Sequence, residues 1–203
     1  MRIALRTLPL SLIGLIVLII AACRPSPTPE PPSTEAPYVT TATIKDLMLS
    51  IIDPNADVVW ESVSMVSNEQ GVTETVPKTD EDWARVRHGA MTLAEASNLL
   101  MMPGRRVARP GEKSETPGVE LEPEEMDVLI AKDRASWNKR AGALRLAALD
   151  ILKAVDAKDP AKVFEIGEHI EMACEGCHSE YWYPGEEIPQ SVIFTAPEPV
   201  KKP

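Results

Sequence analysis

The sequence is poor in cysteine and in basic residues, and it has no run of alternating apolar and polar residues typical of a half-buried strand. Three cysteines are too few for a disulfide scaffold. The 21 Lys and Arg against 31 Asp and Glu argue against nucleic-acid binding, because phosphate recognition needs clustered cations. Apolar residues, by contrast, make up 44% of the 203 residues, which is enough for a packed core. Wholesale disorder is therefore excluded, and one domain with extensions is expected.

Residues 1–22 have the organisation of a secretory signal. A start with two arginines is followed by an apolar stretch over residues 8–20 and then by two alanines before Cys23. A cysteine after small residues resembles the lipobox of bacterial lipoproteins, and this resemblance implies that Cys23 becomes a lipidated N-terminus. The alternative is an uncleaved transmembrane anchor, although the apolar stretch is shorter than a bilayer-spanning helix usually needs. Both interpretations place the rest of the chain outside the cytoplasm.

The lipidated cysteine and a proline-rich tether are assigned to residues 23–42. The density of proline over residues 24–37 favours an extended polyproline II chain, with a disordered linker as the alternative. Arg24 rather than Asp follows the cysteine, which, by resemblance to lipoprotein sorting in Gram-negative bacteria, would permit transfer to the outer membrane. We therefore expect an extracytoplasmic protein that is anchored by lipid to the periplasmic side of a bacterial membrane.

Four amphipathic segments follow, and apolar residues at helical spacing mark each of them. The first two begin with capping-box patterns, Thr43 with Asp46 and Thr79 with Asp82. The predicted helices run from residue 43 to about 67 with an interruption at Asp53-Pro54, from 79 to 102, from 123 to about 156, and from 160 to 183. Because most links are short, we expect an all-α, antiparallel four-helix bundle over residues 43–183 and an extended tail over 184–203. The connection 103–122 is long, and loops of that length are usually functional or disordered.

One motif indicates a chemistry. Cys174-Glu175-Gly176-Cys177-His178 has the C-x-x-C-H pattern of covalent haem attachment. Thiols at i and i+3 lie on one face of a helix, so Cys174 and Cys177 can join the two vinyl groups on one edge of a haem. His178 then offers its imidazole to the iron from the same side. A thioredoxin-like dithiol would need a preceding strand, zinc would need four ligands, and a disulfide across so short a loop would gain little.

A signal-bearing four-helix bundle with this motif on its last helix resembles the class II c-type cytochromes, namely cytochrome c-prime and its low-spin relatives. The resemblance covers residues 43–183 and rests on the motif and on the aromatic Tyr181. It implies one covalent haem c, with His178 as the proximal iron ligand and Tyr181 as a candidate haem contact. Trp182 stands where family members often have a basic residue, and the 103–122 loop also departs from the family pattern.

The second axial ligand decides between functions. In the resembled family the distal residue sits on the first helix, and it is Met in low-spin electron carriers or a bulky, non-ligating residue in gas-binding members. Met48 lies among the apolar residues of the first predicted helix, so we expect its thioether to be the distal iron ligand, with Met65 in reserve. The alternative is that Met48 only fills the core, as methionine often does.

Other candidate groups carry weaker signals. Arg105, Arg106 and Arg109 could pair with haem propionates or with acidic partners, but a solvated basic loop is the favoured interpretation. The remaining expectations are that His88 and His169 lie at the surface and that Trp60, Trp83 and Trp137 fill the core.

These observations predict a membrane-tethered monohaem cytochrome that carries electrons by Fe(II)/Fe(III) cycling and is not an enzyme. The expected partners are redox proteins and, through the N-terminal lipid, a membrane. Members of the resembled class are often dimers, which makes a homodimer a candidate assembly. One alternative is a five-coordinate haem that binds a small gas such as nitric oxide. A second alternative is a haem-free thiol oxidoreductase that uses Cys174 and Cys177.

Overall fold

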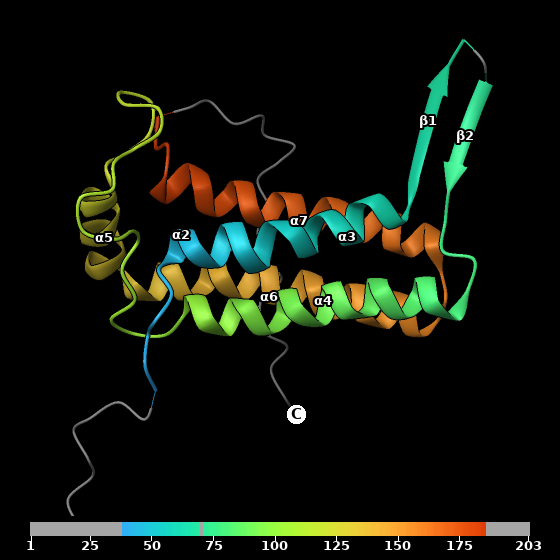
Figure 1. Ribbon diagram of the computed structural model, residues 1–203, viewed down its shortest axis with the longest axis horizontal. Helices are drawn as coiled ribbons and strands as arrows, with labels where there is room; N and C mark the ends of the chain where they lie inside the picture. The colour runs from blue at the N-terminus through green and yellow to red at the C-terminus, as the bar shows by residue number, and fades with distance from the viewer. Residues whose placement is uncertain (1–37, 70, 186–203) are drawn as a thin grey trace, which may run out of the picture. The chain divides into compact units, whose positions relative to one another are not determined.

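The computed structural model describes residues 38–69 and 71–185, so the predicted signal, Cys23, most of the tether and most of the tail lie outside the described residues. The helices and strands all lie within residues 40–185. The described chain is mostly helical with one two-stranded sheet (Figure 1). Its elements are α2 (Ile44–Leu47), the π-helix η2 (Met48–Ile52), α3 (Asp53–Ser62), β1 (Ser64–Asn68), β2 (Gly71–Thr75), α4 (Asp80–Leu100), α5 (Pro123–Lys132), α6 (Arg134–Asp156) and α7 (Pro160–Tyr181).

The predicted helix starts are confirmed by their caps. Thr43 and Asp46 exchange two hydrogen bonds of 3.0 Å between side chain and backbone at the start of α2. Thr79 and Asp82 form the same reciprocal pair at the start of α4. Asp159 accepts a hydrogen bond from the Lys162 backbone N–H at 3.0 Å and so caps α7. Each cap satisfies N–H groups that the first helical turn leaves without an internal partner.

The predicted interruption at Asp53-Pro54 takes the form of a π-helix. Proline lacks an N–H, and in an α-helix its ring clashes with the carbonyl four residues earlier. The Asp53 N–H donates to the Met48 carbonyl oxygen, which is the wider i to i+5 spacing of a π-turn. The Asn55 side-chain amide donates to the Ile51 carbonyl oxygen at 2.7 Å beside this interruption. Helix η2 thus ends two residues before Pro54, which stands in the first turn of α3.

The prediction that the first helix continues to residue 67 is wrong. Helix α3 ends at Ser62, Val63 is extended, and β1 pairs with β2 in an antiparallel hairpin that projects from the helices (Figure 1). The side chains of both strands are exposed except for that of the first residue, which is partly buried. Val63, which caps α3, is still buried in the core, but Val66 lies on the exposed hairpin, where its helical spacing has no packing consequence. The positive φ of Gly71 and the β-branched residues then favour the hairpin.

The prediction of one helix over residues 123–156 is also wrong, because Asp133 separates α5 from α6. Asp133 has φ −135° and ψ 74°, and its carboxylate accepts a hydrogen bond from the Ser136 N–H at 2.9 Å. This cap starts a new helix while the apolar spacing on either side continues in phase. In Figure 1, α5 lies at the end of the helical array, next to the 103–122 segment.

The core lies between α3, α4, α6 and α7. Helix α6 makes the most extensive contacts, with α4 and with α7, and α3 packs against α4 and α7 (Figure 1). Trp83 and Trp137 are buried as expected, whereas Trp60 is partly buried and donates its indole N–H to the Gly167 carbonyl oxygen at 3.1 Å. Among residues 38–69 and 71–185, no helix has both the length and the apolarity needed to cross a bilayer.

Candidate functional site

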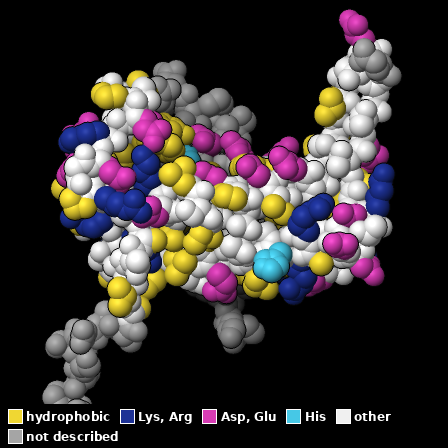
Figure 2. Space-filling model, in the orientation of Figure 1, with side chains coloured by type: hydrophobic (Ala, Val, Ile, Leu, Met, Phe, Trp, Pro, Cys, Tyr) yellow, Lys and Arg dark blue, Asp and Glu magenta, His cyan; other side chains and the backbone are white. Residues whose placement is uncertain are grey.

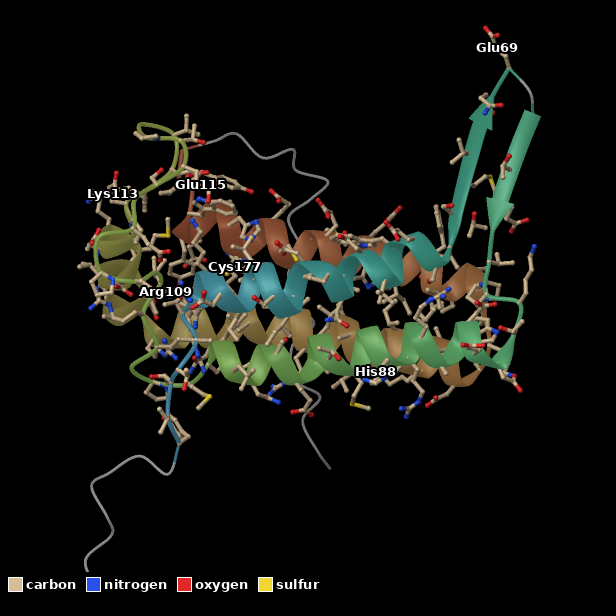
Figure 3. The ribbon with its side chains drawn as sticks, in the orientation of Figure 1. Glu69, His88, Arg109, Lys113, Glu115 and Cys177 are labelled. Atoms are coloured by element: carbon tan, nitrogen blue, oxygen red, sulfur yellow. The ribbon has the colours of Figure 1, made fainter. Side chains whose placement is uncertain are left out.

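A mostly apolar cavity of about 190 Å³ opens at the end of the helical array that carries α5. The beginning of the first helix and the carboxyl end of α7 form two of its walls, and the 103–122 segment, α5 and α6 contribute the rest. Figure 3 labels Cys177 in this region, together with Lys113 and Glu115 of the 103–122 segment. The lining residues include Met48, Met126, Trp137, Cys177, His178 and Tyr181, and the polar ones include Lys45, Lys113, Glu115 and Glu120.

The structure brings most of the predicted site residues to this cavity. Cys177, His178 and Tyr181 from α7 and Met48 from the first turn of η2 all line it. Cys174 does not line the cavity, but it lies one turn earlier on α7, where it packs partly buried against the core. Both thiols of the motif are free.

Met65 is not near the site, which corrects its place as the reserve ligand. It lies on β1 with 65% of its surface exposed, because the helix on which it was expected ends three residues before it. A second methionine that sequence reasoning missed, Met126 of α5, lines the cavity instead. The position of Met126 depends on the helix break at Asp133. In the sequence this break is marked only by the helix-capping pattern of an Asp three residues before a Ser.

Burial suppresses the acidity of both thiols. It raises the pKa of Cys174 to about 12, with the negative charge of Glu171 adding to the effect. Burial likewise raises the pKa of Cys177 to about 12, against a smaller opposing effect of the Arg140 cation. Because the thiolate is the nucleophile in disulfide exchange, neither cysteine has the low pKa of a redox-active thiol.

Aromatic and acidic side chains surround His178 at the carboxyl end of α7. Its ring meets Trp182 edge-on at 4.9 Å between centroids and lies 6.0 Å from the ring of Tyr183. Its Nδ1 is 3.6 Å from Oε1 of Glu175. Burial lowers the pKa of His178, although Glu175 and Asp53 oppose this shift. The imidazole is therefore neutral at pH 7, which is the form that binds a metal.

The π-helix contributes one side of the cavity. Met48 is its first residue, and the side chain is partly buried against the core. Single π-turns in otherwise α-helical segments occur frequently at functional sites, because the extra residue per turn changes the direction of neighbouring side chains. Met48 and His178 reach the same cavity from separate helices.

The expectation of a solvated basic loop is wrong for Arg105, whereas Arg106 and Arg109 are exposed as expected. Arg105 is buried and donates to the backbone carbonyl oxygens of Leu99 and Ala42. Arg106 and Arg109 are exposed, but they form ion pairs with acidic residues of α5 and α2, at 2.6 Å and 2.8 Å. None of the three arginines lines the cavity. The lysines that do, Lys45 and Lys113, belong to no sequence motif.

Residues 103–122 form a wall that is fastened to both sides of the cavity. On the side of Met48, the N–H groups of Ile44 and Lys45 donate to the carbonyl oxygens of Arg106 and Val107, both at 2.9 Å. On the side of His178, the Leu121 N–H donates to the Trp182 carbonyl oxygen at 2.8 Å. This long connection is therefore ordered by contacts remote in sequence and forms part of the site.

Comparisons with protein-family models, with curated proteins and with solved structures find no match for this chain. Within the described residues, no group of three or more His, Cys, Asp and Glu side chains is placed to hold a metal ion. A haem needs no such group, because its macrocycle supplies four nitrogen donors and the protein supplies only axial ligands.

Tyr181 lies inside the protein, whereas His88 and His169 lie at or near its surface. Tyr181 is buried, its ring meets Trp137 edge-on at 5.2 Å, and its hydroxyl makes no hydrogen bond of normal geometry. Burial raises the pKa of this hydroxyl to about 12. His88 is exposed on α4, as expected, and Figure 3 shows it well away from Cys177. His169 of α7 is partly exposed.

Proposed function

We propose that the protein is a monohaem c-type cytochrome that transfers electrons. The observation that carries this proposal is the meeting, at one apolar cavity, of Cys177 and His178 of the C-x-x-C-H motif with the thioether of Met48. The packing of α3, α4, α6 and α7 as neighbours supports an antiparallel four-helix bundle, as in the resembled class II cytochromes.

The residues present fit a covalently bound haem. The thiol S–H groups of Cys174 and Cys177 would add across two vinyl groups, which forms two C–S bonds without any change in oxidation state. His178 would bind iron from the proximal side, and Tyr181 would pack against the macrocycle. Lys45 and Lys113 line the cavity, where they pair with Glu115 at 2.7 Å and with Glu122 at 3.6 Å, and they would exchange these partners for the propionates.

The bound group would supply a one-electron Fe(II)/Fe(III) couple. The chain would contribute burial in an apolar site, a fixed imidazole and the Met48 thioether, a ligand pair that raises the potential and favours electron transfer. The wall formed by residues 103–122 would exclude water on the Met48 side. Redox proteins would be the partners, and the predicted lipid at Cys23 would tether the carrier to a membrane.

The thiol oxidoreductase alternative has less support. Such enzymes use a thiolate, whereas burial raises the pKa of both Cys174 and Cys177 to about 12. The motif also stands on a long helix that follows another helix, rather than after a strand.

The experiment uses the chain produced with cytochrome c maturation machinery, and its first readouts are haem staining on a denaturing gel and the visible spectrum. We expect covalent haem and a low-spin ferrous spectrum that carbon monoxide does not change. Met48→Ala should give a high-spin form that binds carbon monoxide. Met126→Ala is the matched control, because it truncates another methionine of the same cavity and should leave the spectrum low-spin.

Each other outcome corrects a particular part of the proposal. Protein without covalent haem rejects it altogether. A high-spin wild type that binds carbon monoxide supports a gas-binding module instead. A low-spin spectrum that survives Met48→Ala but is lost in Met126→Ala assigns the distal position to Met126.

A further inference from the structure

The first residue between the two motif cysteines carries a carboxylate that faces the motif histidine. Oε1 of Glu175 lies 3.6 Å from Nδ1 of His178, three residues along the same helix. This distance is longer than that of a normal hydrogen bond, and because the imidazole is neutral the contact joins a carboxylate to a polar ring rather than two opposite charges. The two side chains are 28% and 24% exposed, so water screens their interaction less than it screens a fully exposed pair.

Contacts from the residues that follow α7 hold this carboxylate in place. The Tyr183 hydroxyl donates to Oε2 of Glu175 at 2.7 Å, which leaves Oε1 directed towards His178. Tyr183 is itself held, because its N–H donates to the His178 carbonyl oxygen at 3.0 Å. The backbone thus folds back on the last turn of α7, so that Tyr183 contacts Glu175 and Glu175 contacts His178.

Two further carboxylates act on His178, but no hydrogen bond or ion pair joins either of them to its ring. Asp53 of α3 and Glu171 of α7 add negative charge near the imidazole. Figure 2 shows acidic side chains gathered along the visible surface above α3 and α7. Glu171 lies one helical turn before Glu175 and therefore offers a control for charge without contact.

We propose that Glu175 is the positioning residue of the proximal histidine. If His178 binds iron through Nε2, its Nδ1–H faces Glu175, which fixes the ring orientation and the tautomer and makes the imidazole a stronger donor. A stronger donor and an adjacent negative charge favour Fe(III), so Glu175 lowers the reduction potential. This inference rests on the proposed cytochrome function.

The test compares the midpoint potentials of haem-loaded wild type, Glu175→Gln and Glu171→Gln by optical titration of the full chain. Loss of a partner of this kind typically changes metal-site equilibria by about tenfold or more. We therefore expect Glu175→Gln to raise the potential by about 59 mV, the tenfold value for a one-electron couple. Glu171→Gln removes the same charge and should shift the potential by less than a third of that amount.

A readout that a merely structural role would not change is the ¹⁵N signal of His178 Nδ1 in the ferrous protein. Glu175→Gln should shift this signal, whereas Glu171→Gln should not. Tyr183→Phe keeps the carboxylate but removes its anchor, so it should raise the potential by a smaller amount than Glu175→Gln.

The outcomes separate this inference from the function on which it rests. A wild type without covalent haem overturns both. A haem-loaded wild type in which the two glutamate variants shift the potential equally, or in which Glu175→Gln leaves it unchanged, overturns the role of Glu175 alone.

Discussion

Alkylation of the two α7 thiols tests whether the motif is as deeply buried as the structure indicates. The perturbation is iodoacetamide added to residues 38–203 made without haem attachment, a chain that lacks Cys23. A pKa of about 12 for Cys174 and Cys177, against an ordinary value of 9.0, leaves about 1,000-fold less thiolate at pH 8. Because only the thiolate reacts, each site should be alkylated about 1,000-fold more slowly than in the urea-unfolded chain.

The assay is mass spectrometry of the peptide that contains both cysteines, taken over time at several pH values. Since the folded pKa is raised, the rate should increase about tenfold per pH unit until about pH 11, whereas the unfolded chain should level off near pH 9. Glu168→Cys supplies an internal reference, because Glu168 is exposed on the same helix and a cysteine there should react at the ordinary rate. Folded and unfolded rates within tenfold of each other would refute the reasoning, and they would return the thiol oxidoreductase to consideration.

Two stability predictions test the helix packing that positions the site, both by urea unfolding followed by circular dichroism. A Cβ added at Gly89 of α4 would lie 3.1 Å from the Asn55 carbonyl oxygen, so Gly89→Ala should destabilise the fold by about 1–2 kcal/mol. Gly142 of α6 is the control, because a Cβ there would meet nothing closer than 4.0 Å, and Gly142→Ala should stabilise the fold by about 0.5–1 kcal/mol. Equal effects of the two substitutions would contradict the close approach of α3 and α4. Trp137→Phe removes the buried donor that binds the Leu100 carbonyl oxygen at 2.8 Å and should cost about 1–3 kcal/mol, and a loss below 0.5 kcal/mol would show that this bond contributes little.

The helix starts and the place of the motif could be predicted from sequence because they depend on neighbours in the chain. A threonine with an aspartate three residues later satisfies its own helix terminus wherever it stands, and the caps at Thr43 and Thr79 formed as expected. The i, i+3 spacing of Cys174 and Cys177 likewise places both thiols on one face of α7 before any packing occurs.

Apolar periodicity missed two helix limits, each for its own physical reason. Apolar spacing indicates a helix only where a partner buries the apolar face, and the hairpin 64–75 has no such partner. At Asp133 the spacing continues through a local cap that ends one helix and starts another. Periodicity alone cannot detect either event, because the first depends on tertiary contacts and the second on one side-chain hydrogen bond.

By itself, the sequence determined that the chain is mostly helical, where most helices begin, and that two thiols and an imidazole share one end of the last helix. Tertiary structure alone decided that Met48 and Met126 share a cavity with His178, that Lys45 and Lys113 line it, and that residues 103–122 wall it. The physical reason is the range of the interactions: caps and helical faces depend on residues three or four apart. The cavity depends on contacts between segments more than 60 residues apart, such as Arg109 with Asp46, and no local pattern records these.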